Sequence, residues 1–300
     1  MAGRWQNPPP NPIKDLIDEA EKAFKAAGFD VPRFQARVIM AHILDIDIGT
    51  MASEARREIT PHQVRAFRHL VSQRADHMPL NYVLGNVEFM GLTFLCDARA
   101  LSPRQETELL AEMVVERVQK DDFHGGIALD IGCGSGVLGL TLAHFAPSLH
   151  VIGSDISFDA LQLFSENARR LGVTDTVTAV QGRYIDWLWH HNSDRIAYIV
   201  SNPPYVRPDE YDNLDPEITQ YEPQEALVSH TDDGLGAYWE IAMRLDIFQK
   251  LRIVAFEIGY QQQEVRQIMR EARPDMHWEL HNDYSGNPRI VIGENRWLID

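Results

Sequence analysis

The stretch SNPPYV, which follows an apolar run, holds the residues whose types and spacing most clearly suggest a chemical role. Two successive prolines fix two backbone φ angles, remove two amide donors and push Asn202 away from helical geometry. The result is a stiff, extended corner that presents carbonyl oxygens, an amide side chain and the ring of Tyr205. A similar string at residues 7–10 lies in a polar, proline-rich segment with no strand before it, so context decides what the corner does.

A second chemical feature is the loop LDIGCGSG, in which Gly132, Gly134 and Gly136 alternate after an expected strand. Glycines there permit positive φ and let a ligand approach the backbone. Residues 134–139 match the dinucleotide fingerprint G-x-G-x-x-G, but its first glycine falls two residues late. The strand ends in Asp130, whose carboxylate suits a cationic ligand without phosphate. The loop therefore favours S-adenosylmethionine over a dinucleotide, with a ligand-free turn as the remaining alternative.

Asp155 ends the next expected strand, where an acidic side chain can bind both hydroxyls of a ribose. A dinucleotide would use the same acid, so Asp155 does not separate the two ligands. An N-cap-like role before the following helix is the alternative for this residue.

The corner at residues 202–205 fits one kind of reaction. An amide or amino nitrogen conjugated to a π system is a poor nucleophile because its lone pair is delocalised. The Asn202 side-chain oxygen and the Pro203 carbonyl can accept the two N–H bonds of such a group, while Tyr205 can stack on its plane. This is catalysis by positioning and preorganised dipoles, and it needs no strong general base.

Around these motifs the chain divides into four expected parts. Residues 1–11 are expected to form a disordered proline-rich tail, and apolar residues at spacings of three and four predict a helical bundle over 12–82. A hairpin with Gly91 at its turn is expected within 83–102 as a linker. From 103 to 300, strands and helices alternate, which predicts an α/β, doubly wound sheet with a final antiparallel hairpin. Both motifs would then lie at the carboxyl ends of its strands.

Composition narrows the function classes. The net charge is −16, with 44 acidic and 28 basic residues, which disfavours direct DNA binding. No apolar run approaches the roughly 20 residues that span a bilayer, and the N-terminus resembles no presequence, so we expect a cytoplasmic protein. Two cysteines make a disulfide framework unlikely in this class, and His190 and His191 are interpreted as a solvated turn, so no metal site is expected.

Together the glycine loop and the NPPY corner resemble class I S-adenosylmethionine-dependent amino-methyltransferases. Over nearly the whole chain the sequence further resembles the release factor glutamine methyltransferases, the PrmC/HemK family. The segments that carry this resemblance are AGFDVPRFQARVIMAHIL, LNYVLGNVEFMGLTF, LSPRQETELL, YEPQEALVSHTDDGLGAY, FEIG and DYSGNPRIVIG.

The resemblance implies a Rossmann-like seven-stranded methyltransferase domain, preceded by a small helical domain that docks the substrate. It implies N5-methylation of the glutamine in the GGQ motif of peptide chain release factors, by an enzyme expected to be a monomer. The implied cofactor-binding residues are Asp130, Gly132, Cys133, Gly134, Ser135, Gly136, Asp155, Tyr184 and Asn202. The implied substrate-binding residues are Arg104, Asn202, Pro203, Pro204 and Tyr205. Arg183 and Ser102 depart from the commoner family pattern.

Three alternatives remain open. A sister family methylates a glutamine of ribosomal protein L3, but its counterpart of PRQETE usually reads PR-S-P-x-x-E. Methylation of adenine N6 or cytosine N4 would use the same corner on a flipped base and would need a basic surface. A noncatalytic binding module is the third alternative, and binding alone does not need both Asp130 and Asn202.

Overall fold

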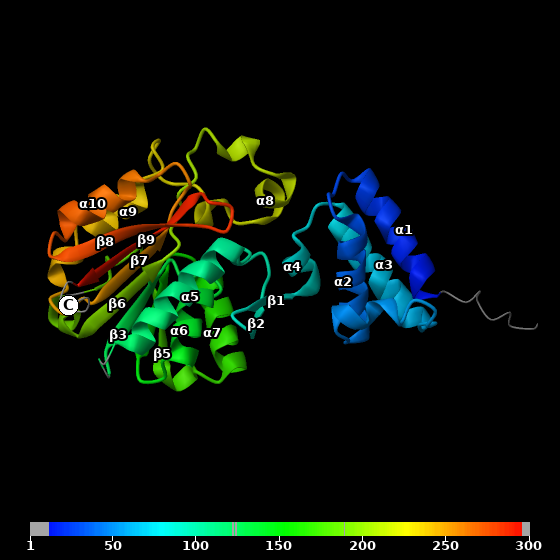
Figure 1. The fold of residues 1–300 in the computed structure, drawn as a ribbon, viewed down its shortest axis with the longest axis horizontal. Helices are drawn as coiled ribbons and strands as arrows, with labels where there is room; N and C mark the ends of the chain where they lie inside the picture. The colour runs from blue at the N-terminus through cyan, green and yellow to red at the C-terminus, as the bar shows by residue number, and fades with distance from the viewer. Residues whose placement is uncertain (1–11, 122, 124, 189, 296–300) are drawn as a thin grey trace, which may run out of the picture. The chain divides into compact units, whose positions relative to one another are not determined.

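A computed structural model describes residues 12–121, 123, 125–188 and 190–295 of the 300-residue chain (Figure 1). The chain forms two compact units, residues 1–84 and residues 85–300. The expected tail over residues 1–11 lies outside the described residues.

The first unit is the helical bundle that the apolar spacing predicts. Its core is formed by one face of each helix, including Phe24, Ile39 and Phe67. Thr60 begins the third helix with a capping box, in which its hydroxyl accepts from the Gln63 amide and the Gln63 side chain accepts in return. The helices are α1 (Ile13–Ala26), α2 (Pro32–Leu44), α3 (Pro61–Ala75) and α4 (Leu80–Leu84), with a 3-10 turn η1 at Ile48–Ala52.

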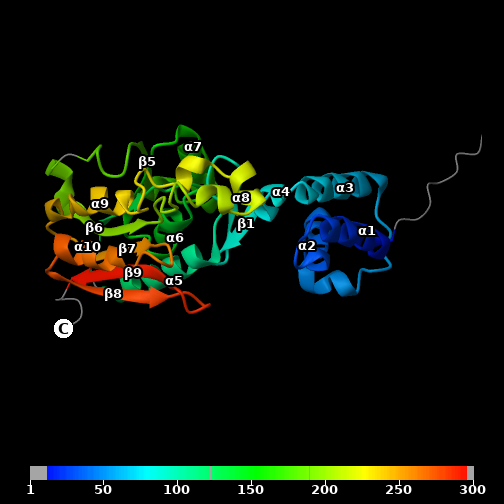
Figure 2. The ribbon, with the colours of Figure 1, turned by 90° about the horizontal axis from the view of Figure 1, so that it is seen from above.

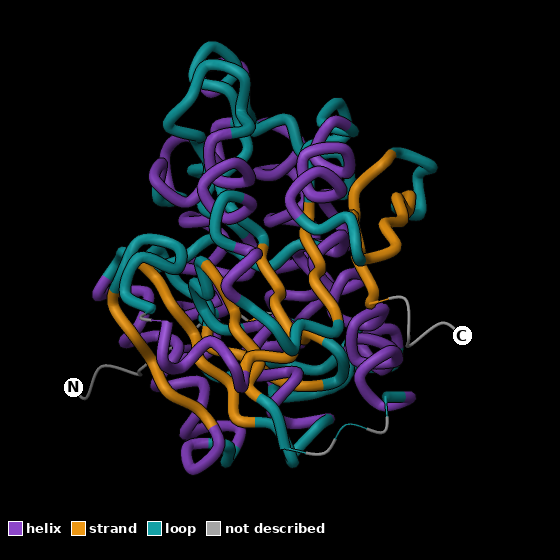
Figure 3. Tube along the Cα trace, turned by 90° about the vertical axis from the view of Figure 1, so that its left-hand side faces the viewer, coloured by secondary structure: helices purple, strands orange, loops and turns teal. Residues whose placement is uncertain are grey.

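The second unit contains a seven-stranded sheet in the order β5-β4-β3-β6-β7-β9-β8. Figure 3 shows strands of this sheet side by side, in orange. The first five strands in this order run parallel, while β9 pairs antiparallel with β7 and with β8. Figure 2 shows β8 and β9, in orange and red, at one edge of the sheet. The strands are β3 (Ile127–Ile131), β4 (His150–Asp155), β5 (Val177–Gln181), β6 (Ile196–Ser201), β7 (Ile253–Glu257), β8 (Met276–Asn282) and β9 (Pro288–Asn295). This confirms the expected sheet and its antiparallel edge.

Helices cover both faces of this sheet, as Figure 1 shows. Side chains alternate along each strand, so Leu129 and Phe256 pack in the core under α9 and α10, while Ala128 and Ala255 pack in the core under α5, α6 and α7. Both faces are therefore buried, as in other parallel sheets. The helices are α5 (Gln105–Lys120), α6 (Val137–Phe145), α7 (Phe158–Leu171), α8 (Pro216–Tyr221), α9 (Gly236–Ala242) and α10 (Glu264–Ala272).

The expected hairpin is present as β1 (Asn86–Phe89) and β2 (Leu92–Leu95). Met90 and Gly91 both adopt positive φ in its two-residue turn. The hairpin belongs to the second unit, because the Asn167 side chain on α7 accepts from the Leu95 amide at 2.7 Å and donates to the Leu95 carbonyl at 3.1 Å.

No helix among the described residues is long and apolar enough to cross a membrane.

Candidate active site

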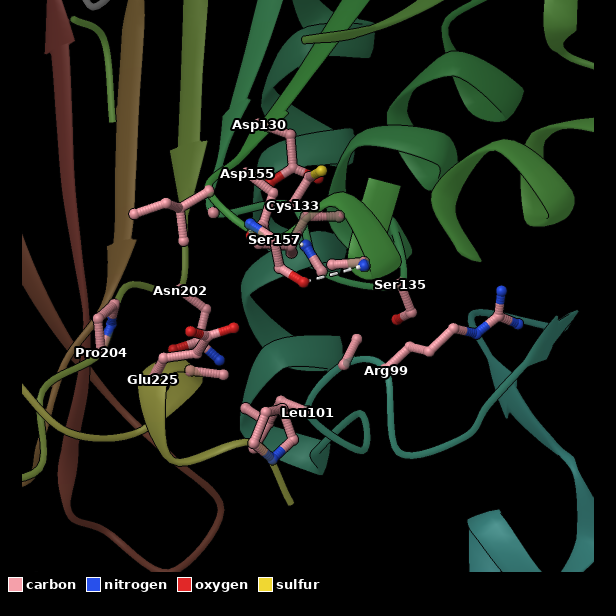
Figure 4. Close-up of a pocket in the computed structure, with 18 of the residues that line it drawn as sticks. Arg99, Leu101, Asp130, Cys133, Ser135, Asp155, Ser157, Asn202, Pro204 and Glu225 are labelled. Carbon is pink, nitrogen blue, oxygen red and sulfur yellow. Dashed lines mark hydrogen bonds between the residues drawn. The ribbon is translucent and has the colours of Figure 1, made fainter. Parts of the chain in front are cut away.

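Four neighbouring strands carry a polar side chain where each one ends. Asp155 ends β4, Asp130 lies near the end of β3, Asn202 follows β6, and Glu257 ends β7. These strands are consecutive in the order β4-β3-β6-β7, so the four side chains lie in a row along one edge of the sheet. Figure 4 shows Asp130 and Asp155 on one side of the site, with Asn202 and Pro204 beyond the end of β6.

A cavity of about 290 Å³ opens along this edge. It lies where β3 has β4 on one side and β6 on the other, which is the point at which a doubly wound sheet binds ligands. Its walls come from six segments: residues 99–107, the glycine loop, the end of β4, the end of β5, the NPPY corner, and residues 223–230.

The glycine loop is shaped by backbone conformations that favour glycine. Gly132, Gly134 and Gly136 have φ of 69°, 52° and 88°. The amides of Gly132 and Cys133 both donate to the Ser154 carbonyl, which ties the loop to β4. A Cβ on Gly132 would meet nothing within 4 Å, so the backbone at this point stands open to a ligand.

Asp130 has an unusual environment. Its Oδ2 accepts from the Gly139 amide at 2.8 Å in the first turn of α6, while Oδ1 is buried and accepts no hydrogen bond from the described part of the chain. Burial raises the pKa of Asp130 to about 7. A buried carboxylate oxygen without a partner, on the wall of a cavity, is a ready acceptor for a cationic donor.

Asp155 is already bonded to backbone. Its Oδ2 accepts from the Gly134 amide and its Oδ1 from the Ser157 amide, each at 2.9 Å. Ser157 in turn is the N-cap of α7, accepting from Ala160. Burial raises the pKa of Asp155. The carboxylate thus holds the glycine loop against the start of α7, and each oxygen keeps a lone pair for a ligand.

The NPPY corner is held on both sides. Before it, the Ser201 hydroxyl donates to the Ile131 carbonyl at 2.6 Å and joins β6 to β3. After it, the Gln262 side chain donates to the Tyr205 carbonyl at 2.9 Å. Within the corner, the Asn202 amide nitrogen donates to the Thr107 hydroxyl at 3.2 Å. The corner is therefore rigid, as the two prolines predict.

The far end of the cavity is built around Tyr184, which has φ of 47°. The guanidinium of Arg183 lies over its ring and is bonded to Glu240 on α9 at 2.7 Å. His230 also lies against Glu240, at 2.8 Å, with its ring 6.4 Å from that of Tyr184. The departure at Arg183 is thus accommodated by an ion pair with α9.

The chain matches two protein-family models and several known proteins. Residues 15–85 match the PrmC N-terminal domain and residues 103–220 the methyltransferase small domain. The chain is 33% identical to the release factor glutamine methyltransferase of Bacillus cereus, over 86% of this chain and 90% of that protein. It is 32% identical to the one from Moorella thermoacetica, over 95% of this chain and 99% of that protein.

The chain belongs to the release factor glutamine methyltransferase family. It is therefore a methyltransferase that depends on S-adenosylmethionine. The hMettl16 catalytic domain, solved with the MAT2A 3'UTR hairpin 6, shares the fold at 10% identity, with a TM-score of 0.50 over 80% of this chain and 84% of that one.

The site fits this cofactor. The unpaired Asp130 oxygen can accept from a positively charged group, and the open backbone at Gly132 leaves room beside it. A bound pyrophosphate would place its charge next to Asp130 and Asp155, so the donor set favours a cation over a dinucleotide.

Most of the predicted site residues come together. The cavity wall contains Asp130, Gly132, Cys133, Gly134, Ser135, Asp155, Tyr184, Asn202 and Pro204. As far as the described residues go, Arg104, Gly136, Pro203 and Tyr205 are not part of that wall. Arg104 donates to both oxygens of the buried Glu222 at 2.7 Å, and the Tyr205 hydroxyl donates to Glu257 at 3.3 Å. Substrate contacts of Arg104 and stacking by Tyr205 stay predictions.

Three polar residues of the site are not among those predicted from the sequence: Thr107, His230 and Glu257. The sequence does hint at Glu257, because this acidic residue lies near the end of the apolar run RIVAFEIG, as Asp130 lies near the end of its own strand. The described residues contain no cluster of side chains that could hold a metal ion.

Proposed function

We propose that this enzyme transfers a methyl group from S-adenosylmethionine to the side-chain amide nitrogen of a glutamine, the one in the GGQ motif of peptide chain release factors. The observation that carries the proposal is the placement of the Asn202 amide on the wall of the cavity, one strand from the unpaired carboxylate of Asp130. The relatives from Bacillus cereus and Moorella thermoacetica, which this chain matches over most of its length, are release factor glutamine methyltransferases.

The chain's own residues would act by orientation. The Asn202 oxygen and the Pro203 carbonyl accept the two N–H bonds of the glutamine amide, which holds its nitrogen and raises its electron density. Pro204 packs beside the amide, and Tyr205 stacks on its plane. The proton that the nitrogen loses leaves after transfer, so no strong base is required.

We place the cofactor at the ends of β3 and β4, where Asp130 and Asp155 lie. When bound, S-adenosylmethionine supplies a methyl group carried on a positively charged sulfur. We assign Asp130 to its charged end, the backbone from Gly132 to Gly136 to close contact, and Asp155 to the ribose hydroxyls. Cys133 and Ser135 line the loop, and Tyr184 flanks the adenine.

The partner is a protein loop, and the GGQ segment is the part of a release factor that would enter the cavity. The net charge of −16 gives no support to DNA as the substrate. Release factors act on ribosomes, so we place the reaction in the cytoplasm, and we propose that the enzyme acts as a monomer. Residues 12–82 are proposed to dock the release factor.

The experiment that tests this function is a transfer assay with labelled S-adenosylmethionine. Release factor, its GGQ-to-GGA variant, ribosomal protein L3 and duplex DNA are offered in parallel. We expect label on the release factor and none on the GGA variant. Asn202→Ala should abolish the label while cofactor affinity stays within a few-fold. Label on L3 or DNA instead would refute the proposed substrate.

A further inference from the structure

A chain of hydrogen bonds leads from the buried Glu257 to the Asn202 amide. The Thr107 hydroxyl donates to Glu257 Oε2 at 2.6 Å, and Asn202 Nδ2 donates to the same hydroxyl at 3.2 Å. Glu257 Oε1 accepts from the Tyr205 hydroxyl at 3.3 Å. Glu257 and Thr107 are 1% and 3% exposed, and they come from β7 and the first turn of α5.

The direction of this chain is fixed by chemistry. An ionised carboxylate can only accept, so the single proton of the Thr107 hydroxyl points to Glu257. The hydroxyl then offers only lone pairs to Asn202, and the NH2 end of the carboxamide is the end that can use them. The Asn202 oxygen is consequently turned away from Thr107, and no donor in the described part of the chain is bonded to it.

We propose that Thr107 and Glu257 are positioning residues, which determine that the Asn202 carboxamide presents its oxygen rather than its nitrogen to the substrate amide. This inference rests on the proposed function, because it concerns how the same amide is recognised. An NH2 group presented in place of the oxygen would face the N–H bonds of the glutamine donor to donor.

A purely structural tie between α5 and β7 would not need a carboxylate. Burying an ionised group is costly, and two apolar side chains would join the elements without that cost. Glu257 is bonded to two hydroxyls, and the charges that act on it are Arg289 on β9 and Glu106 on α5. A carboxylate such as that of Glu257 can only accept hydrogen bonds, however, and this property fixes the direction of the hydrogen bonds from Asn202 through Thr107.

The protonation state of Glu257 sets the polarity of the chain. Burial raises the pKa of Glu257 to about 7, with Glu106 adding to the rise and Arg289, Thr107 and Tyr205 opposing it. A protonated Glu257 can donate to Thr107, whose hydroxyl is then free to donate to the Asn202 oxygen. The correct orientation is therefore present above the pKa and is lost as the pH falls through it.

The test compares turnover and binding in matched variants. Thr107→Val removes the hydroxyl at nearly constant volume, and Thr107→Ser restores it. We expect kcat to fall about tenfold or more in Thr107→Val and to return to within about threefold of wild type in Thr107→Ser. Cofactor Kd, measured by calorimetry, should stay within about threefold in both, because the hydroxyl is already bonded to Glu257 and Asn202.

A pH profile supplies the second readout. Wild-type kcat should rise between pH 6 and 8 with a midpoint of about 7. In Glu257→Gln, a near-isosteric change, this rise should disappear and kcat should stay low. Unchanged kcat in Thr107→Val, or the same pH profile in Glu257→Gln, would overturn the inference. A wild-type enzyme that labels no release factor would instead overturn the proposed function, so the two failures are distinct.

Discussion

At the scale of single residues, the three acidic side chains at the sheet edge differ in their hydrogen bonds. Asp155 and Glu257 have both oxygens bonded to the protein, whereas Asp130 has one oxygen bonded and one buried without a partner in the described chain. Burial is the largest cause of the raised pKa in all three. Asp130 is thus the carboxylate with one oxygen, Oδ1, left to be stabilised by a bound cation.

The cofactor-free enzyme should carry a pH-dependent cost at Asp130. Its folded pKa of about 7 lies above the ordinary value of 3.8. The folded state then binds more protons than the unfolded state between these values, so stability falls as the pH rises from 4 to 7. Asp130→Asn removes this term. Relative to wild type, the variant should gain about 1–3 kcal/mol of unfolding free energy between pH 4.5 and 7.5.

Urea unfolding at these two pH values measures the difference. Asp175→Asn, at an exposed carboxylate in the same domain, is the control and should show no pH-dependent gain. A constant difference between wild type and Asp130→Asn at both pH values would show that the pKa of Asp130 is not raised in the folded protein.

The residues that could be found from the sequence are those whose chemistry is local. Asn202 is marked by the prolines that follow it, and Asp130 by the glycines that follow it. Thr107 and Glu257 are 150 residues apart and meet because α5 packs on β7. Nothing near either residue in the chain predicts that contact, since it depends on strand order.

At the scale of elements, close packing of helices explains why the third position of the glycine loop, Gly136, is a glycine. Gly136 has φ of 88°, and a Cβ there would lie 2.7 Å from both Leu140 and Phe164. It stands at the N-cap of α6 and lets that helix and α7 approach each other. Packing thus excludes a Cβ at Gly136, whereas a Cβ at Gly132 would face open space.

Gly136→Ala should therefore lower the free energy of unfolding by more than the backbone strain of an alanine at positive φ alone would. A matched control is Gly172→Ala, because Gly172 also has positive φ, at the end of α7, and a Cβ there would meet nothing within 4 Å. We expect about 1 kcal/mol for Gly172→Ala and about 2–4 kcal/mol for Gly136→Ala in urea unfolding. Equal losses in the two variants would mean that the loop can shift to make room.

Elements were predictable where one periodicity runs without interruption. The strand at residues 196–201 is a continuous apolar run, and the helix at residues 158–171 has Leu161, Phe164 and Ala168 at spacings of three and four. Helix α5 was not predicted, although Leu110, Val114 and Val118 carry its spacing and are buried. The short helices α8 and α9 depend on packing over the site, and no periodic run of residues marks them.

At the scale of the whole molecule, the two units have separate hydrophobic cores. The core of the first unit uses residues between Ile13 and Leu84, and the cores of the second use residues between Val87 and Ile292. The cofactor site, the NPPY corner and the Thr107–Glu257 chain all lie within residues 85–300. The residues assigned to catalysis and the helical bundle thus belong to different units of the chain.

Removing residues 1–84 tests whether the helical unit docks the release factor. The remaining chain keeps its complete cores, so we expect it to fold and to bind cofactor with an affinity within a few-fold of the full chain. Losing a second contact surface should raise KM for full-length release factor by about 100-fold. Turnover of a short GGQ peptide, which is too small to reach a second unit, should be nearly the same in both proteins. Equal KM for the intact release factor would show that the helical unit has another purpose, and equal losses on peptide and protein would show that the catalytic unit itself was damaged.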